Sequence, residues 1–140
     1  MPVENLARSD VVTATTDEPI HGLAATMHDE DVGSVVVVDG DEPVGIVTDR
    51  DLTIHVLAER ADPDDLSAEN VMSDDLQTID HDAGFYRATE LMSDRGVRRL
   101  PVTDADGELS GIITIDDLNE LLADEHGELA EVVRAQRPPY

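Results

Sequence analysis

The hydrophobic pattern of the chain occurs twice. In each half, a short extended segment is followed by apolar positions at helical spacing, and two short apolar runs bounded by turn residues then lead into a second helical pattern. Runs of this length between turns favour buried strands, so each half predicts the order strand, helix, strand, strand, helix. The elements expected in the first half cover residues 11–14, 20–27, 35–38, 44–47 and 52–57. Those expected in the second half cover residues 76–79, 85–92, 100–103, 110–113 and 118–122, followed by a further short helix at 129–133 that is interrupted near Gly127.

The two halves align position by position, which indicates an internal duplication. Asp10 aligns with Asp75 and Met27 with Met92 at an offset of 65 residues. The offset increases by one residue between the last two strands of each half, inside a turn-rich segment that we expect to be a hairpin loop. Insertions are tolerated in such loops, so the flanking strands keep their equivalence.

A Gly-apolar-x-Thr-x-x-Asp stretch ends the third strand of each half, at residues 45–51 and 111–117. A strand that feeds a helix here leaves free backbone N–H groups and the positive end of the helix dipole at one corner, beside a Thr hydroxyl and an Asp carboxylate. Such a corner suits a phosphorylated ribose, with the hydroxyl toward the phosphate and the carboxylate accepting from sugar hydroxyls. An ordinary N-cap explains either copy alone, but two copies in one frame favour a ligand site.

This arrangement resembles a tandem pair of cystathionine-beta-synthase (CBS) domains over roughly residues 10–123, on the basis of residues 45–52, Val71-Met72, 97–104 and 111–118. The resemblance implies an α/β fold in which two tandem β-α-β-β-α CBS repeats, a CBS pair or Bateman module, pack about a pseudo-twofold axis and leave two clefts between them. The expected division of the chain is an N-terminal segment at 1–9, CBS domain 1 at 10–67, a linker at 68–74, CBS domain 2 at 75–130 and a tail at 131–140.

By this resemblance, the clefts bind an adenosine compound such as AMP, ADP, ATP or S-adenosylmethionine, as a regulatory ligand and not as a required cofactor. The family's ligand-binding roles carry over to eight residues of this chain. They are Asp51 and Asp117 for the ribose hydroxyls, Thr48 and Thr114 for the phosphate or the sugar edge, Thr13 and Thr78 in strands that bracket the adenine, and Arg98 and Arg99 for the phosphates.

The two halves differ where phosphates are expected to bind. Gly33-Ser34 stands in the first half where the second has Arg98-Arg99, and Asp116 stands where the first has Arg50. The sequence therefore leaves open whether one cleft or both are occupied. Surface ion pairs with some of the many carboxylates explain Arg98 and Arg99 equally well, and they are the preferred interpretation of Arg50. If Arg98 and Arg99 both lie in a strand, only one of them faces the cleft.

The charge of the chain is strongly negative. Its 33 acidic residues against 9 basic ones give a formal net charge of −24, and every basic residue is an arginine. This composition resembles that of proteins from salt-accumulating, halophilic microbes. In molar salt the Debye length falls to roughly 3 Å, so repulsion among surface carboxylates is screened, whereas in dilute buffer it destabilises the fold. Nonspecific nucleic-acid binding requires a basic stripe, and the sequence has none.

Other functional classes find no support in the sequence. It has no cysteine, nucleophile elbow, P-loop or dinucleotide fingerprint, so we expect neither an enzyme nor catalytic residues. The acidic turn at residues 104–108 lacks the glutamate that a calcium loop needs at its twelfth position, so no metal site is expected. No leader and no apolar run of about 20 residues occur, which favours a cytoplasmic protein without membrane contact.

The leading hypothesis is a stand-alone regulatory module. An adenosine nucleotide binds between the repeats, senses the energy state of the cell and, by a change of conformation or association, signals to an effector protein that the sequence does not identify. A homodimer is expected, formed through apolar faces of the helices that follow each Thr-x-x-Asp turn. The alternative is a ligand-free structural module that serves only in dimerisation, as a scaffold. A small acid-catalysed hydrolase is the least favoured hypothesis.

Overall fold

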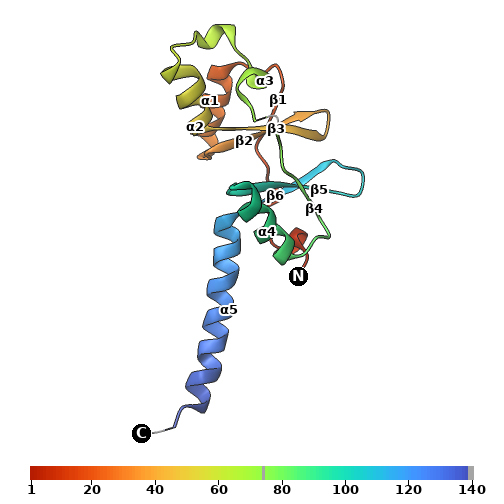
Figure 1. Ribbon diagram of the computed structural model, residues 1–140, viewed down its shortest axis with the longest axis vertical. Helices are drawn as coiled ribbons and strands as arrows, with labels where there is room; N and C mark the ends of the chain where they lie inside the picture. Colours follow the sequence, from red (N-terminus) through yellow and green to blue (C-terminus); the bar gives the residue numbers. More distant parts are fainter. Residues whose placement is uncertain (74, 139–140) are drawn as a thin grey trace.

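The computed structural model describes residues 1–73 and 75–138. The two repeats form two stacked lobes, with the sheet of each lobe turned toward the other and most helices on the outer sides (Figure 1). In each three-stranded sheet the first strand lies parallel to the second, which forms an antiparallel hairpin with the third, and this confirms the predicted α/β repeats. The strands are β1 (Thr13–Thr15), β2 (Ser34–Asp39), β3 (Glu42–Thr48), β4 (Ile79–Asp80), β5 (Arg99–Thr103) and β6 (Leu109–Thr114).

The helices follow the predicted order in both repeats, with short helical turns added between them. α2 continues without a break into the π-helical segment η2, so that the two form one helical stretch after β3. The helices are η1 (Val3–Asn5), α1 (Ile20–Glu30), α2 (Asp49–Leu52), η2 (Thr53–Ala58), η3 (Pro63–Asp65), α3 (Ala68–Val71), α4 (Phe85–Arg95) and α5 (Ile115–Gln136).

The two hairpins share one register. Thr48 at the end of β3 lies opposite Ser34, and Thr114 at the end of β6 lies opposite Arg99. A shift in the pairing follows Val37 in one hairpin and Val102 in the other, which are equivalent positions of the duplication. The hairpins therefore carry the two Thr-x-x-Asp turns to equivalent places in the two lobes.

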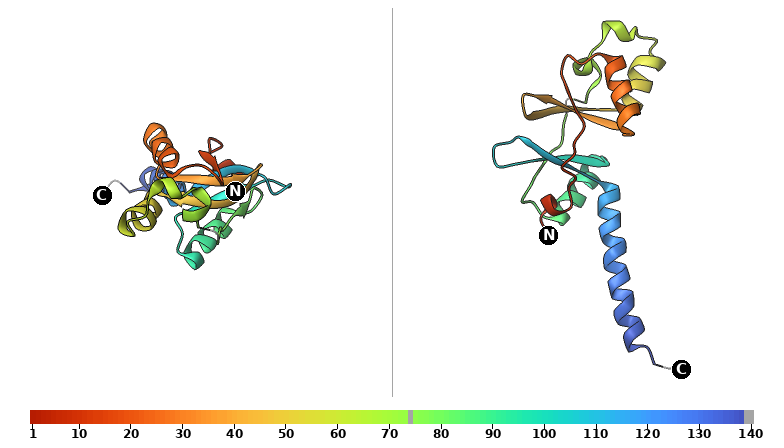
Figure 2. Two further views of the ribbon diagram at one scale, coloured as in Figure 1. Left: turned by 90° about the horizontal axis from the view of Figure 1, so that it is seen from above. Right: turned by 180° about the vertical axis from the view of Figure 1, so that it is seen from behind.

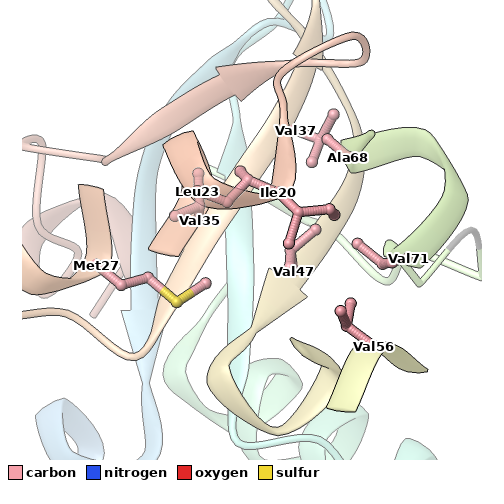
Figure 3. Close-up of a cluster of buried hydrophobic side chains, with 9 residues drawn as sticks. All are labelled: Ile20, Leu23, Met27, Val35, Val37, Val47, Val56, Ala68 and Val71. Atoms are coloured by element: carbon pink, nitrogen blue, oxygen red, sulfur yellow. The ribbon is translucent and has the colours of Figure 1, made fainter. Parts of the chain in front are cut away.

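Each lobe has its own hydrophobic core between the sheet and the helices. Leu23 of α1 and Leu100 of β5 are fully buried, and burial of one leucine side chain stabilises a fold by roughly 2 kcal/mol. The first core contains Ile20, Leu23, Met27, Val35, Val37, Val47, Val56, Ala68 and Val71 (Figure 3). The second contains Val3, Ile79, Ala88, Met92, Leu100, Val102, Ile113 and Leu118.

The segment that precedes each repeat packs against the other repeat. Val3 of η1 is buried in the core of the second lobe, and its N–H donates to the carbonyl of Ala83 at 2.8 Å. Val71 of α3 is buried in the core of the first lobe, and the following Ser73 N–H donates to the carbonyl of Ile46 at 3.0 Å. Figure 2 shows the N-terminal segment beside α4, on the lobe opposite to β1. The two lobes are therefore tied together at both segments.

The expected domain boundaries remain predictions. Residues 1–9 and 68–73 contribute side chains to the two cores, beyond the roles of an N-terminal segment and a linker. Helix α5 runs across the expected boundary after residue 130. Residue 74 of the expected linker and residues 139–140 of the expected tail lie outside the described part of the chain.

Helix α5 differs from the sequence expectation. It is one helix of 22 residues, where we expected two with an interruption near Gly127. A single glycine costs a helix about 1 kcal/mol relative to alanine, which is too little to end a helix between strong helix formers. The C-terminal part of α5 projects away from both lobes (Figures 1 and 2). No helix in the described part of the chain has both the length and the apolar character needed to cross a membrane.

The opening strands are shorter than expected and begin later. β1 begins at Thr13, although the carbonyl of Val12 still accepts from the N–H of Val36 at 3.0 Å. β4 contains only two residues, and Thr78 immediately precedes it. The end of a strand depends on which residues find partners in the neighbouring strand, and a local hydrophobic pattern does not contain that information.

Candidate ligand clefts

Two clefts lie between the lobes, and each takes residues from both repeats. Cleft 1, of about 420 Å³, is lined by Ile46, Thr48, Asp49, Arg50, Asp51, Ser73, Gly96, Val97, Arg98 and Arg99. Cleft 2, of about 350 Å³, is lined by Arg8, Asp10, Val11, Val12, Asp31, Val32, Gly33, Ser34, Val36, Arg99, Ile112, Thr114 and Asp116. The duplication relates most of one lining to the other, so the clefts are two versions of one pseudo-symmetric site.

The Thr-x-x-Asp turn of cleft 1 is a capping box. The Thr48 hydroxyl accepts from the N–H of Asp51 at 3.1 Å, and Oδ2 of Asp51 accepts from the N–H of Thr48 at 2.8 Å. Such an N-cap stabilises the helix by about 1 kcal/mol. Among the described residues, no donor contacts Oδ1 of Asp51. This turn therefore has a structural role and also presents one carboxylate oxygen for another contact.

The equivalent turn of cleft 2 is also a capping box, but its carboxylate carries an additional partner. Oδ2 of Asp117 accepts from the N–H and the hydroxyl of Thr114, at 2.9 Å and 3.0 Å. Oδ1 of Asp117 accepts a hydrogen bond from Nε of Arg8 at 3.1 Å. Nη2 of Arg8 lies 3.1 Å from the same oxygen and completes the ion pair. The Asp117 side chain is only 7% exposed. Oδ1 of Asp51 in cleft 1 is thus available for a ligand, whereas the equivalent Oδ1 of Asp117, beside cleft 2, is bound to a guanidinium.

Both members of the Arg98-Arg99 pair line cleft 1. The strand alternation that would turn only one of them toward the cleft does not apply, because β5 begins at Arg99 and Arg98 lies in the preceding turn. Arg99 also lines cleft 2, since it lies opposite Thr114 in the sheet. One side of each cleft is therefore formed by the start of β5.

Charge distinguishes the two clefts. Cleft 1 brings three arginines, Arg50, Arg98 and Arg99, together with Asp49 and Asp51. Within the described residues none of these arginines forms an ion pair. The surface ion pair that we expected for Arg50 is therefore not found there. Arginine clusters bind phosphate well, because the guanidinium donates two parallel hydrogen bonds. The charged lining of cleft 2 is more acidic and consists of Arg8, Arg99, Asp10, Asp31 and Asp116.

The remaining candidate residues lie outside the linings of the two clefts. Thr13 is exposed on β1 and lines a separate hollow of about 280 Å³ with Ser9 and Ser110 among others. Thr78 is half-buried just ahead of β4. Asp117 is absent from the lining of cleft 2 and lines a small hollow with Asn5 and Glu120 among others. The ligand-binding roles of the eight residues stay predictions, and the structure brings Thr48, Asp51, Arg98 and Arg99 together in one place.

The sequence analysis did not identify Arg8 or Asp31 as cleft residues. The internal duplication could have pointed to both residues, because the offset of 65 residues extends to the N-terminus and aligns Arg8 with Ser73 and Asp31 with Gly96. Asp31 and Gly96 end α1 and α4 in the same left-handed conformation, with φ of 54° and 63°. Glycine has no steric penalty in that conformation, whereas aspartate is only tolerated there.

Two carboxylate contacts on other surfaces shift pKa values. Hydrogen bonding to Glu4, at 2.9 Å from Nδ1, raises the pKa of His81 above its ordinary value of 6.5. Repulsion by Asp41 of the other lobe, followed by that of Asp104, raises the pKa of Glu108 above 4.5. Neither group lines cleft 1 or cleft 2. The described residues include no group of three or more histidine or acidic side chains arranged to hold a metal ion.

Comparisons of the sequence identify one family. The model of the CBS domain family matches residues 3–58 and 68–124, and so includes the segments that precede both repeats. The uncharacterised protein MK0525 of Methanopyrus kandleri is 41% identical over 117 residues, which are 83% of this chain and 60% of that protein. The CBS domain-containing protein YhcV of Bacillus subtilis is 30% identical over 116 residues, which are 83% of this chain and 81% of YhcV.

Solved structures share the fold. The CBS-domain containing protein ATU1752 of Agrobacterium tumefaciens is 31% identical with a TM-score of 0.76, over 86% of this chain and 98% of that one. The CBS domain pair of protein MJ0100, in complex with 5′-methylthioadenosine and S-adenosyl-L-methionine, has a TM-score of 0.79 over 89% of this chain and 98% of that one. Its identity of 22% shows likeness of fold alone.

Proposed function

Because the chain belongs to the CBS domain family, we propose that it is a regulatory CBS pair that binds an adenosine nucleotide in cleft 1. The observation that carries this proposal is the meeting, in one cavity of about 420 Å³, of the Thr48–Asp51 turn with Arg50, Arg98 and Arg99. The binding of adenosine compounds by the CBS pair of MJ0100 supports the class of ligand.

The residues of cleft 1 match the parts of a nucleotide. Oδ1 of Asp51 accepts from the ribose hydroxyls, while Oδ2 keeps its hydrogen bond to the backbone of Thr48. Arg98 and Arg99 donate to the phosphate, and Ile46 and Val97 supply apolar surface for the base. A cavity of this size lies within the range of about 300–1,000 Å³ that is typical of small-molecule sites.

Binding in cleft 1 links the two lobes. The Thr48–Asp51 turn belongs to the first repeat and the Arg98-Arg99 segment to the second, so a bound nucleotide contacts both. The nucleotide favours the arrangement of the lobes that closes the cleft. The free energy by which it shifts the equilibrium cannot exceed the difference between its binding free energies for the closed and open arrangements. Competition between AMP and ATP for this cleft couples the arrangement to the energy state of the cell. The output passes to an effector protein, through a change in conformation or in homodimer association.

Calorimetric titration with AMP, ATP and S-adenosylmethionine in molar KCl tests the proposal. The test compares Asp51→Asn with the matched control Asp117→Asn, which alters the same position of the other capping box. Loss of one hydrogen bond to a charged group weakens binding by roughly 10–100-fold, so we expect that loss in Asp51→Asn and less than about a threefold change in Asp117→Asn. Absence of heat from all three compounds would instead favour the ligand-free scaffold.

A further inference from the structure

The carboxylate beside cleft 2 is already bound within the chain. Arg8 donates from Nε to Oδ1 of Asp117 and forms an ion pair with it, and Thr114 donates to Oδ2. In cleft 1, the equivalent Oδ1 of Asp51 has no donor among the described residues. The proposed ribose contact uses this oxygen, so a ribose in cleft 2 must first displace a guanidinium from a carboxylate that is 7% exposed.

The backbone holds Arg8 in this position. Its N–H donates to the carbonyl of Ile112 at 2.9 Å, and its own carbonyl accepts from the N–H of Ile112 at 3.0 Å. The Arg8 carbonyl oxygen lies only 2.9 Å from the place where a Cβ would stand on Gly111, so the glycine permits this close approach. Val3, at the start of the same segment, is anchored in the core of the second lobe. The guanidinium is thus supplied by a strand pairing that is part of the fold.

Cleft 1 has the same strand pairing without the cation. Ser73 forms an isolated bridge with Ile46, as Arg8 does with Ile112. The duplication aligns Ser73 with Arg8, and a serine brings no positive charge toward Asp51. Besides their other differences in charge, the two clefts therefore differ at this position. Its backbone is equivalent in both, and its side chain decides what the carboxylate contacts.

We propose that Arg8 occupies the ribose position of cleft 2, so that the chain binds one adenosine ligand, in cleft 1, and not two. This inference rests on the proposed function, because it uses the same contact between ribose and carboxylate. The three aspartates that line cleft 2, Asp10, Asp31 and Asp116, independently disfavour a phosphate there. An uncharged nucleoside removes this second effect, so adenosine is the probe that isolates the role of Arg8.

Calorimetric titration of the full chain with adenosine in molar KCl tests the inference through the number of sites. We expect one site in the wild type and two in Arg8→Ser, which copies Ser73. The second site disappears again in the double variant Arg8→Ser/Asp117→Asn. Arg8→Lys, which retains a cation, keeps one site. Arg134→Ser removes an arginine from an exposed pair with Glu131, and as a matched control it also keeps one site.

The outcomes separate this inference from the proposed function. Two sites in the wild type, or one site in a folded Arg8→Ser protein, overturn the role of Arg8 and leave nucleotide binding intact. If Arg8→Ser does not fold, Arg8→Met, which keeps an unbranched apolar stem, replaces it with the same expected doubling. Absence of binding by the wild type to adenosine, AMP, ATP and S-adenosylmethionine alike overturns the proposed function, and the inference with it.

Discussion

Asp51 and Asp117 occupy equivalent positions in two capping boxes, yet among residues 1–73 and 75–138 a cation contacts the second carboxylate oxygen of Asp117 and none contacts that of Asp51. The difference arises from the segment that runs past each turn. The segment beside Asp117 precedes the first repeat and contains Arg8, whereas the segment beside Asp51 precedes the second repeat and contains Ser73. The fold requires equivalent backbones in these two segments but not identical side chains. A duplicated motif therefore gives two equivalent backbones and two chemically different sites.

The pair of Arg8 and Asp117 also contributes to stability. We expect Arg8→Ser to lower the free energy of unfolding by about 1 kcal/mol, because the buried carboxylate of Asp117 loses a charged donor. The value is modest because Arg8 itself is 61% exposed and water screens the pair. Urea denaturation in molar KCl measures the change. Arg134→Ser, the control, is expected to change stability by less than about 0.5 kcal/mol, and an Arg8→Ser value within that range would contradict the prediction.

The contact between Glu4 and His81 predicts a pH dependence. It raises the folded-state pKa of His81 above 6.5, so the folded protein holds this proton more tightly than the unfolded chain. The stabilisation is complete below pH 6.5 and disappears as the pH rises through the folded-state pKa. Glu4→Gln should therefore lower the melting temperature at pH 5.5–6, with little effect near pH 8.5. Glu69→Gln serves as control, and a Glu4→Gln effect that is equal at both pH values contradicts the pairing.

The two hairpin loops repel each other at Glu108. Asp41 of the first lobe contributes most to raising the pKa of Glu108 in the second, so the folded state disfavours its charged form. The resulting loss of folding stability is absent well below pH 4.5, where Glu108 is protonated, and it grows as the pH rises through the folded-state pKa of Glu108. We expect Glu108→Gln to raise the melting temperature at pH 7 in dilute buffer, and this gain to vanish in molar KCl.

A control for Glu108→Gln removes the same charge elsewhere. Glu128 lies exposed on α5, so Glu128→Gln removes one negative charge as Glu108→Gln does, without relieving the contact between the hairpins. If both variants raise the melting temperature by the same amount, the gain comes from total charge and not from the contact with Asp41.

The two leucines Leu100 and Leu129 should respond differently to truncation. Leu100 is fully buried in the core of the second lobe, whereas Leu129 is exposed on the projecting part of α5. We expect Leu100→Ala to cost about 2–5 kcal/mol of unfolding free energy and Leu129→Ala less than about 0.5 kcal/mol. Urea denaturation of the two variants measures this. A comparable loss in Leu129→Ala would show that α5 packs against something in solution.

The sequence predicted the repeats, the hairpins and both Thr-x-x-Asp turns, because these features depend on local spacing and on a duplication visible in the chain. It did not predict the contact between Arg8 and Asp117, since that contact joins residues more than a hundred positions apart through a segment that packs on the other lobe. It also placed an interruption near Gly127, where the flanking residues in fact keep α5 continuous.

The most direct test of the account is a crystal structure of the protein with AMP in molar KCl. We predict AMP in cleft 1 alone, with its ribose on Oδ1 of Asp51 and its phosphate on Arg98 and Arg99, while Arg8 remains on Asp117. AMP bound against Asp117 with Arg8 displaced, or both clefts empty at saturating AMP, would contradict it.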